Sequence, residues 1–274
     1  MQIAQLVYIH PSYPHEAKMK RIPPADVKVA HDPWVRRFHP NNDASIRLAC
    51  FPHAGGSASY YFNVSRALAS DCDVLSIQYP GRQDRRFETP LESVTKLADG
   101  AAAAIALWND RPLLLFGHSL GATLAYEVAQ RLRDSSDIRT IFVSGRRAPS
   151  HHRTNEFVHR QSEQRLLETL RQMNGTAPLL LQDPEMVSAL LPALRSDYRA
   201  AETYRDPKHP PLDVPIVTLN GSQDPEVTAE EIEAWQTHST LPVEHHWFDG
   251  GHFYLNDHAN EVIDLIYANV RAIN

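Results

Sequence analysis

Residues 113–132 combine a short apolar run, a serine between glycines and an amphipathic run, and few folds accommodate that order. The run 113–116 is continuously apolar, as expected of a strand buried on both faces of a parallel sheet. After Ser119, apolar side chains recur at every fourth position, at Leu120, Leu124, Val128 and Leu132. That spacing predicts a helix with one buried stripe. Ser119 is therefore predicted to lie on the turn between a strand and a helix.

The turn itself reads Gly117-His118-Ser119-Leu120-Gly121. Glycines two positions before and after the serine allow a sharp bend and close packing of the helix against the strand. The Gly-x-Ser-x-Gly elbow of α/β-hydrolases has this sequence and these flanks, and it presents the hydroxyl at the sheet edge beside a helix N-terminus. A serine that merely caps the helix is the structural alternative. The strand, the glycines and the helix together favour a nucleophile.

Strand-like and helix-like segments alternate along the rest of the chain. Strands are predicted over residues 46–51, 73–79, 113–116, 138–143, 214–219 and 243–248, and helices near 60–69, 91–108, 120–132 and 260–273. Such alternation implies a mostly parallel sheet with helices on both faces. The predicted class is therefore α/β, an α/β-hydrolase fold, with residues 34–274 as a single domain.

About seventy residues between the strands at 138–143 and 214–219 carry helical patterns but no strand. Apolar residues recur at helical spacing in 162–173 and 183–204. Because this segment is inserted before the strand that carries the predicted acid, we expect a helical lid at about 150–213 that shapes the substrate pocket and moves. A separate small helical domain is the alternative.

A serine nucleophile needs a base, and the base needs a group that orients it. His252 follows two glycines after the last predicted strand, on the sheet edge where the serine also emerges. Asp224 lies in the loop after the preceding strand, and the order Ser119, Asp224, His252 is that of α/β-hydrolases. Asp249 is the main rival as the acid, and Asp257 is the third choice.

The other histidines fit the role of base less well. His245 and His246 lie within a strand, His151 and His152 lie at the start of the lid, and His118 is expected to pack or hydrogen-bond locally. No set of cysteine, histidine and carboxylate residues has the spacing of metal ligands, so we expect no metal.

A tetrahedral intermediate also needs hydrogen-bond donors for its negative oxygen. One donor is predicted to be the N–H of Leu120, directly after the serine. The second is predicted in the loop after the first strand, which contains Gly55 and Gly56 and lets the backbone approach closely. We assign it to the N–H of Ala54.

Composition excludes several functional classes. The chain has 274 residues, 42% hydrophobic and 22% charged, which is typical of a soluble globular protein. Its net charge of −6 argues against a general nucleic-acid binder. No apolar run approaches the ~20 residues that span a bilayer, and the N-terminal sequence lacks the pattern of a signal peptide. The two cysteines, Cys50 and Cys72, are expected to be buried thiols of a cytoplasmic protein.

Seven motifs together resemble the type II thioesterases of nonribosomal peptide and polyketide synthesis. They are FPHAGGSASYY, YPGR, GHSLGA, SGRRAP, LLPALRSDYRAAETY, GSQDP and GGHFYL. The resemblance implies an α/β-hydrolase that needs no cofactor and removes acyl groups from the phosphopantetheine arms of carrier proteins. It implies Ser119 as nucleophile, Asp224 as acid, His252 as base, and Ala54 and Leu120 as oxyanion donors.

Residues 1–33 have no counterpart in this resemblance. We expect them to be an N-terminal extension without fixed structure, or the result of a start codon placed too early. The protein is expected to act as a monomer.

Carrier proteins of these systems are generally acidic, so an acidic enzyme needs a local basic patch to attract them. Six arginines follow the carboxyl ends of two predicted strands, and they are Arg82, Arg85, Arg86, Arg146, Arg147 and Arg153. We expect their guanidinium groups to surround the pocket entrance, because the carboxyl ends of parallel strands share one edge. The structural alternative is that they pair with nearby carboxylates.

Two other functions remain open from the sequence. A small-molecule esterase would use the same catalytic residues but ignore carrier proteins. A catalytically idle hydrolase fold would serve as a binding scaffold, although a complete set of serine, acid and histidine argues against it.

Overall fold

The structure is a computed structural model that describes residues 32–173 and 183–273. The chain divides into two units, Met1–Asp32 and Pro33–Asn274, and the fold described below is that of the second unit. The predicted N-terminal extension lies almost entirely outside the described residues, as does part of the predicted lid.

A sheet of seven strands forms the centre of the described unit, in the order β1-β3-β2-β4-β5-β6-β7. The strands are β1 (Val35–Arg36), β2 (Arg47–Phe51), β3 (Asp73–Ile77), β4 (Leu113–His118), β5 (Ile138–Ser144), β6 (Ile216–Gly221) and β7 (Glu244–Phe248). β1 pairs antiparallel with β3, and the other neighbouring pairs are parallel. All six predicted strands are present, and only the two-residue β1 was not predicted.

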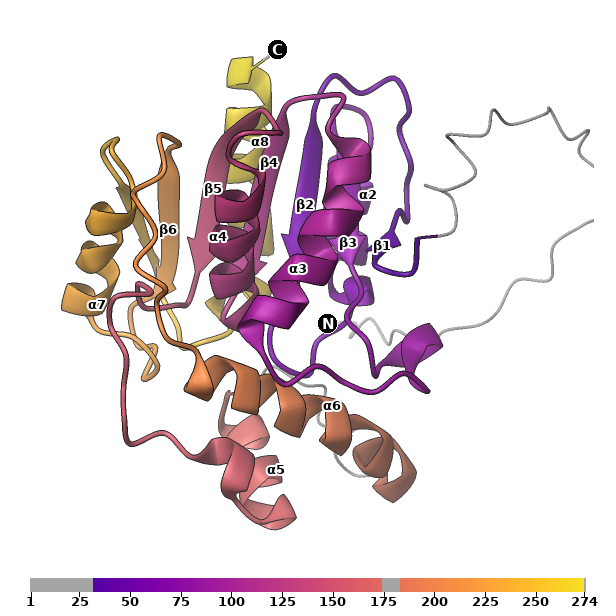
Figure 1. Cartoon of the computed structure of the whole chain (residues 1–274), viewed down its shortest axis with the longest axis vertical. Coiled ribbons are helices and arrows are strands. Elements are labelled where there is room, and N and C mark those ends of the chain that lie inside the picture. Colours follow the sequence, from indigo (N-terminus) through magenta and orange to yellow (C-terminus); the bar gives the residue numbers. More distant parts are fainter. Residues whose placement is uncertain (1–31, 174–182, 274) are drawn as a thin grey trace, which may run out of the picture. The chain divides into compact units, whose positions relative to one another are not determined.

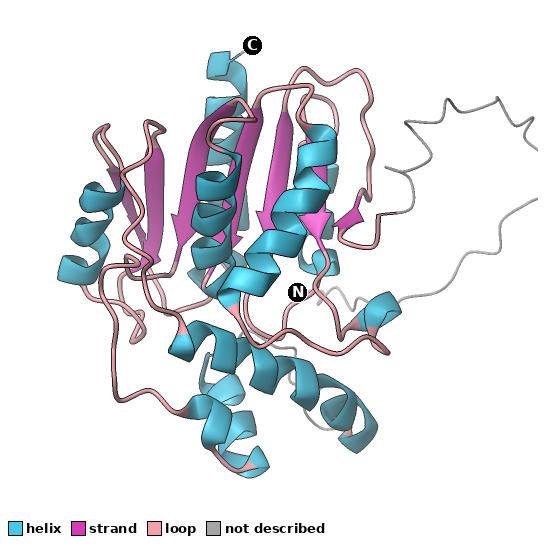
Figure 2. Ribbon diagram, viewed as in Figure 1, coloured by secondary structure: helices cyan, strands magenta, loops and turns pink. Residues whose placement is uncertain are grey.

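Helices cover both faces of the sheet, as the alternation predicted. Helices α3 (Val94–Ile105) and α4 (Leu120–Leu132) cover one face, and α8 (Ala259–Ile273) covers the other (Figures 1 and 2). On the α8 face, buried side chains of the helix join one apolar cluster with those of the central strands, among them Val262, Ile266, Leu114 and Phe116. Burial on both faces explains the largely apolar sequences of β2 and β4, whereas β7 is mostly exposed and polar.

The shorter helices join these elements. They are η1 (Ala58–Tyr61), α2 (Phe62–Ala67), η2 (Gln83–Arg85), η3 (Ala106–Trp108), η4 (Val158–Arg160), α7 (Ala229–Glu233), η5 (Ala234–His238) and η6 (Tyr254–Asn256). The helix α7 was not predicted; it begins with a capping box in which Thr228 and Glu231 satisfy each other's backbone N–H groups. No helix of the described residues is long and apolar enough to cross a membrane.

Two helices occupy the segment between β5 and β6, and they are α5 (Glu163–Met173) and α6 (Pro184–Thr203). Both lie beyond the carboxyl ends of the central strands, where α6 runs across the end of the sheet (Figure 1). Leu166, Leu170 and Leu194 form an apolar cluster of their own, separate from the sheet core. The expected helices of the inserted segment are therefore present, and its mobility stays a prediction.

Candidate active site

Ser119 lies between the end of β4 and the start of α4, at the turn that the sequence predicted. Its backbone has φ +55° and ψ −118°, a conformation that a residue with a side chain rarely adopts. Its N–H donates to the carbonyl oxygen of Ser144 on the neighbouring strand at 2.8 Å. The serine is therefore held in a strained turn by the strand beside it.

The two elbow glycines permit direct contact between backbones. A Cβ atom on Gly117 would lie 2.0 Å from the carbonyl oxygen of Gly121, and one on Gly121 would lie 2.0 Å from that of Phe51. Helix α4 can begin at Leu120, close against β2 and β4, only because both positions lack a side chain.

Asp224 and His252 come together although 28 residues separate them. His252 Nδ1 donates to Asp224 Oδ2 at 2.8 Å, and the exposed fractions of the two residues are 5% and 7%. Because Nδ1 carries the proton toward the carboxylate, Nε2 is left as the basic nitrogen. Asp249 contacts Gln223 instead, through a 2.9 Å hydrogen bond from Nε2, and neither Asp249 nor Asp257 is within ion-pair distance of His252.

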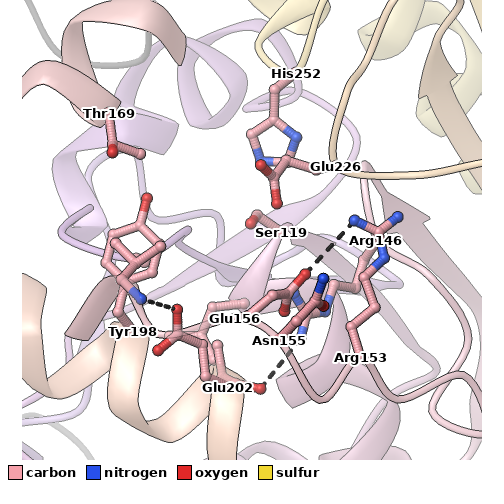
Figure 3. A pocket seen from close by; sticks show the side chains of 14 residues that line it. Ser119, Arg146, Arg153, Asn155, Glu156, Thr169, Tyr198, Glu202, Glu226 and His252 are labelled. Carbon is pink, nitrogen blue, oxygen red and sulfur yellow. Dashed lines mark hydrogen bonds and ion pairs between the residues drawn. The ribbon is translucent and has the colours of Figure 1, made fainter. Parts of the chain in front are cut away.

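Ser119 and His252 line one cavity of about 520 Å³ (Figure 3). They share it with Ala54, Leu120, Arg146, Arg153, Asn155, Glu156, Val158, Thr169, Tyr198, Ala201, Glu202 and Glu226. Ser119 makes no hydrogen bond with His252 in this structure, and catalytic hydrogen bonds of this kind often form fully only in the substrate complex. The N–H groups of Ala54 and Leu120 donate to none of the described residues, so both are available to a ligand.

The residues of this site lie within a region that matches known proteins. Residues 46–270 match the model of the thioesterase domain family. The chain belongs to the thioesterase family. It is a hydrolase of thioesters with an α/β-hydrolase fold.

Individual relatives support this assignment. The chain is 45% identical over 236 residues to thioesterase PikA5 of Streptomyces venezuelae, covering 85% of this chain and 84% of the relative. Its fold is similar to that of the type II thioesterase BorB from the borrelidin biosynthetic cluster, with a TM-score of 0.82 and 45% identity over 86% of this chain and 97% of that one. It is also similar to RedJ, a thioesterase of the prodiginine pathway in Streptomyces coelicolor, with a TM-score of 0.78 and 34% identity over 84% and 92% of the two chains.

Three of the arginines predicted at the entrance of this thioesterase are buried instead. The exposed fractions of Arg82, Arg85 and Arg147 are 7%, 6% and 5%. Each pairs with a carboxylate: Arg82 with Asp197 at 2.7 Å, Arg85 with Glu88 at 2.6 Å, and Arg147 with Glu156. The prediction was wrong for these three because their loops fold back onto acidic partners, and a buried guanidinium needs such a partner.

The other three arginines differ among themselves. Arg86 is exposed and stacks on the ring of Phe87 at 4.2 Å. Arg153 lines the cavity, but it is bound to Glu231 through two hydrogen bonds of 2.8 and 2.6 Å. Arg146 lines the cavity as well, and burial, followed by the charge of Arg147, lowers its pKa to about 10. The basic ring expected at the entrance is therefore reduced to separate side chains in different environments.

Sequence analysis missed the contact that Asp197 makes with the predicted oxyanion loop. Asp197 comes from α6 and is fully buried. Its Oδ2 accepts hydrogen bonds from the N–H of Gly55 at 2.7 Å and from Arg82 Nη1 at 2.7 Å. Arg82 also donates to the carbonyl oxygen of Gly56 at 3.0 Å. One signal was present, because Asp197 continues the apolar helical stripe of Leu190 and Leu194.

Two further histidines lie beside His252. The ring of His118 is 4.9 Å from that of His252 and 6.0 Å from that of His53. His118 Nδ1 is 3.0 Å from Ser144 Oγ, which is the local hydrogen bond that we expected. Burial, and then the charge of His252, lowers the pKa of both residues, that of His53 to about 3. Among the described residues, no group of three or more potential ligands could hold a metal ion.

Proposed function

We propose that this thioesterase hydrolyses acyl and aminoacyl thioesters on the phosphopantetheine arms of carrier proteins, and so clears misprimed units in nonribosomal peptide or polyketide biosynthesis. The observation that carries the proposal is the 2.8 Å contact of His252 with Asp224 beside a cavity that also contains Ser119. The family match supports a thioester as the bond that is cleaved. The biosynthetic settings of BorB and RedJ support a role in a biosynthetic pathway.

In the proposed reaction, Ser119 Oγ attacks the thioester carbonyl carbon while His252 Nε2 takes the hydroxyl proton. Asp224 stabilises the imidazolium through Nδ1–H. The N–H groups of Leu120 and Ala54 bind the oxyanion. When the tetrahedral intermediate collapses, the C–S bond breaks and the imidazolium protonates the departing thiolate. His252 then activates a water molecule, which releases the acid and restores the serine.

A carrier protein loaded with a short acyl group provides the test. Wild-type enzyme should lower the intact mass of the carrier by that of the acyl group, and Ser119→Ala should slow this loss on the order of 10⁶-fold, because it removes the nucleophile. A serine-reactive fluorophosphonate should label wild-type protein and leave Ser119→Ala unlabelled. Turnover of small esters with no turnover of acyl-carrier proteins would favour the stand-alone esterase, and no labelling would favour an idle scaffold.

A further inference from the structure

Most charged side chains around the cavity are neutralised by a neighbour. Arg153 pairs with Glu231 at 2.6 Å and with Glu156 at 3.5 Å. Glu156 also pairs with Arg147. Glu202 accepts a 2.7 Å hydrogen bond from the N–H of Val158 and pairs with His159. These residues form the frame of the cavity, and their charges are already satisfied.

Glu226 and Arg146 are different. Within residues 32–173 and 183–273, neither has an oppositely charged partner within 4.0 Å. Arg146 does have hydrogen-bond acceptors, Thr123 Oγ1 at 3.1 Å and the carbonyl oxygen of Ala201 at 3.4 Å. The carboxylate of Glu226 accepts no hydrogen bond from any described residue. Its charge still favours the protonated forms of Arg146 and Arg153 from a longer distance, but Glu226 is the carboxylate of the described lining that has no direct partner.

The backbone of Glu226 is tied to the proposed catalytic residues. Its N–H donates to Asp224 Oδ1 at 2.9 Å, while the other oxygen of that carboxylate binds His252 Nδ1 at 2.8 Å. The half-buried side chain reaches into the cavity that Ser119 and His252 line (Figure 3). Glu226 is thus anchored at its main chain and free at its carboxylate.

A carboxylate without a direct ion pair works against the proposed reaction unless a cation neutralises it at close range. Like charges repel strongly where water is limited, and the reaction creates a second negative charge on the carbonyl oxygen. A cation carried by the substrate offsets the repulsion between Glu226 and the oxyanion, because it attracts both negative charges. An α-ammonium group meets this need, since it lies one carbon from the reacting carbonyl.

We propose that Glu226 binds the protonated amine of an aminoacyl group, so that aminoacyl thioesters with a free amine are the preferred substrates. This rests on the function proposed above and narrows it to one substrate class. The polar side chains of Asn155, Thr169 and Tyr198 in the same lining suit a small polar acyl group better than a long alkyl chain.

Alanyl and propionyl pantetheine thioesters test the proposal, because they differ only by an ammonium group in place of a hydrogen atom. Each kcat/KM is divided by the uncatalysed rate at the same pH, which corrects for the greater reactivity of the alanyl ester. At about pH 7, wild type should favour the alanyl thioester at least about tenfold, the value expected of one charge-assisted hydrogen bond. Glu226→Gln should reduce that preference about tenfold.

Glu230→Gln is the matched control, because Glu230 is an exposed glutamate of α7 outside the cavity lining. It should keep the wild-type preference. In the wild type the preference should also decline as the pH rises past the α-amino pKa of about 8. In Glu226→Gln it should decline much less.

Three results would overturn the proposal. The first is equal corrected rates for both thioesters in the wild type, and the second is the same preference in Glu226→Gln as in the wild type; either result leaves the thioesterase function standing. The third is that wild-type enzyme hydrolyses neither thioester, nor the same groups on a carrier protein, and this would overturn the proposed function as well.

Discussion

Two buried pairs of an acidic and a basic residue lie near the cavity, and they have different roles. Asp224 and His252 lie 2.8 Å apart, and Arg82 and Asp197 lie 2.7 Å apart, with both carboxylate side chains fully buried. An imidazole gains and loses a proton near neutral pH, whereas a guanidinium stays protonated. His252 lines the cavity and Arg82 does not. Burial and pairing alone therefore do not identify a catalytic group; the ability to exchange a proton at the cavity surface does.

The largest effect is expected when the carboxylate charge of Asp224 is removed. Asp224→Asn should lower kcat on the order of 10⁴-fold, because His252 loses its orientation and the support for its positive charge. Asp249→Asn should cost less than about tenfold, since Asp249 binds Gln223. Steady-state kinetics on an acyl-pantetheine substrate measures both. Similar losses in the two variants would assign the role of acid to Asp249.

The arginine pair should respond in stability. Asp197→Ala leaves the Arg82 guanidinium buried without its carboxylate, so the free energy of unfolding should fall by about 3–5 kcal/mol. It also frees the N–H of Gly55, which should lower kcat more than it changes KM. Urea denaturation measures the first effect and initial rates measure the second.

The double variant Arg82→Met with Asp197→Leu is the control for Asp197→Ala. It should recover most of the stability, because two apolar side chains replace the buried charges. A loss of less than about 1 kcal/mol in Asp197→Ala would show that the pair does not hold α6 in place.

The two pairs also differ in how far the sequence predicted them. Ser119, Asp224 and His252 each follow a strand, and the alternation of strands and helices predicted that these strands are parallel, so the meeting of the three residues on one edge followed from local rules. The contact of Arg82 with Asp197 spans 115 residues, and no periodicity links them.

Arg82 follows a strand just as His252 does, so its position in the chain was known. Whether its side chain points to solvent or into the protein depends on how α6 packs across the strand ends, which local patterns do not specify. Local patterns also do not specify where the side chain of Glu226 points. It lines the cavity because the loop after β6 folds around Asp224.

A third prediction concerns pH, which should affect the histidine region and spare the arginine pair. The pKa values of His53 and His118 are lowered by burial and then by the charge of His252, and both return to about 6.5 in the unfolded chain. Between these values the unfolded state binds more protons, so the free energy of unfolding decreases as the pH falls from 6.5 toward 3.

Each of the two histidines should contribute a slope of at most about 1.4 kcal/mol per pH unit. Urea denaturation at pH 7, 6 and 5 measures it, and His53→Gln should remove the share of one histidine. A slope that His53→Gln leaves unchanged would mean that His53 titrates alike in both states.

The smallest effect is expected from Arg86, the exposed one of the six arginines predicted at the entrance. Arg86→Ala should lower kcat/KM for an acyl-carrier substrate about two- to fivefold at low salt, because surface charges act mainly on association. The loss should fade at high salt and be smaller for an uncharged small thioester. Arg85→Ala should instead lower the free energy of unfolding, since Arg85 is buried against Glu88. Equal salt dependence with both substrates would exclude electrostatic attraction of the carrier.

The glycine contacts at the elbow limit how far this enzyme can be redesigned. Any side chain at Gly117 or Gly121 would force α4 away from the sheet, so a library randomised at these two positions should return glycine whatever substrate is used for selection. Position 226 meets no such barrier, because its backbone is anchored and its side chain ends in the cavity. The elbow glycines therefore cannot be varied in evolution, whereas position 226 can. New substrate specificities can arise at position 226 while the geometry of the elbow stays intact.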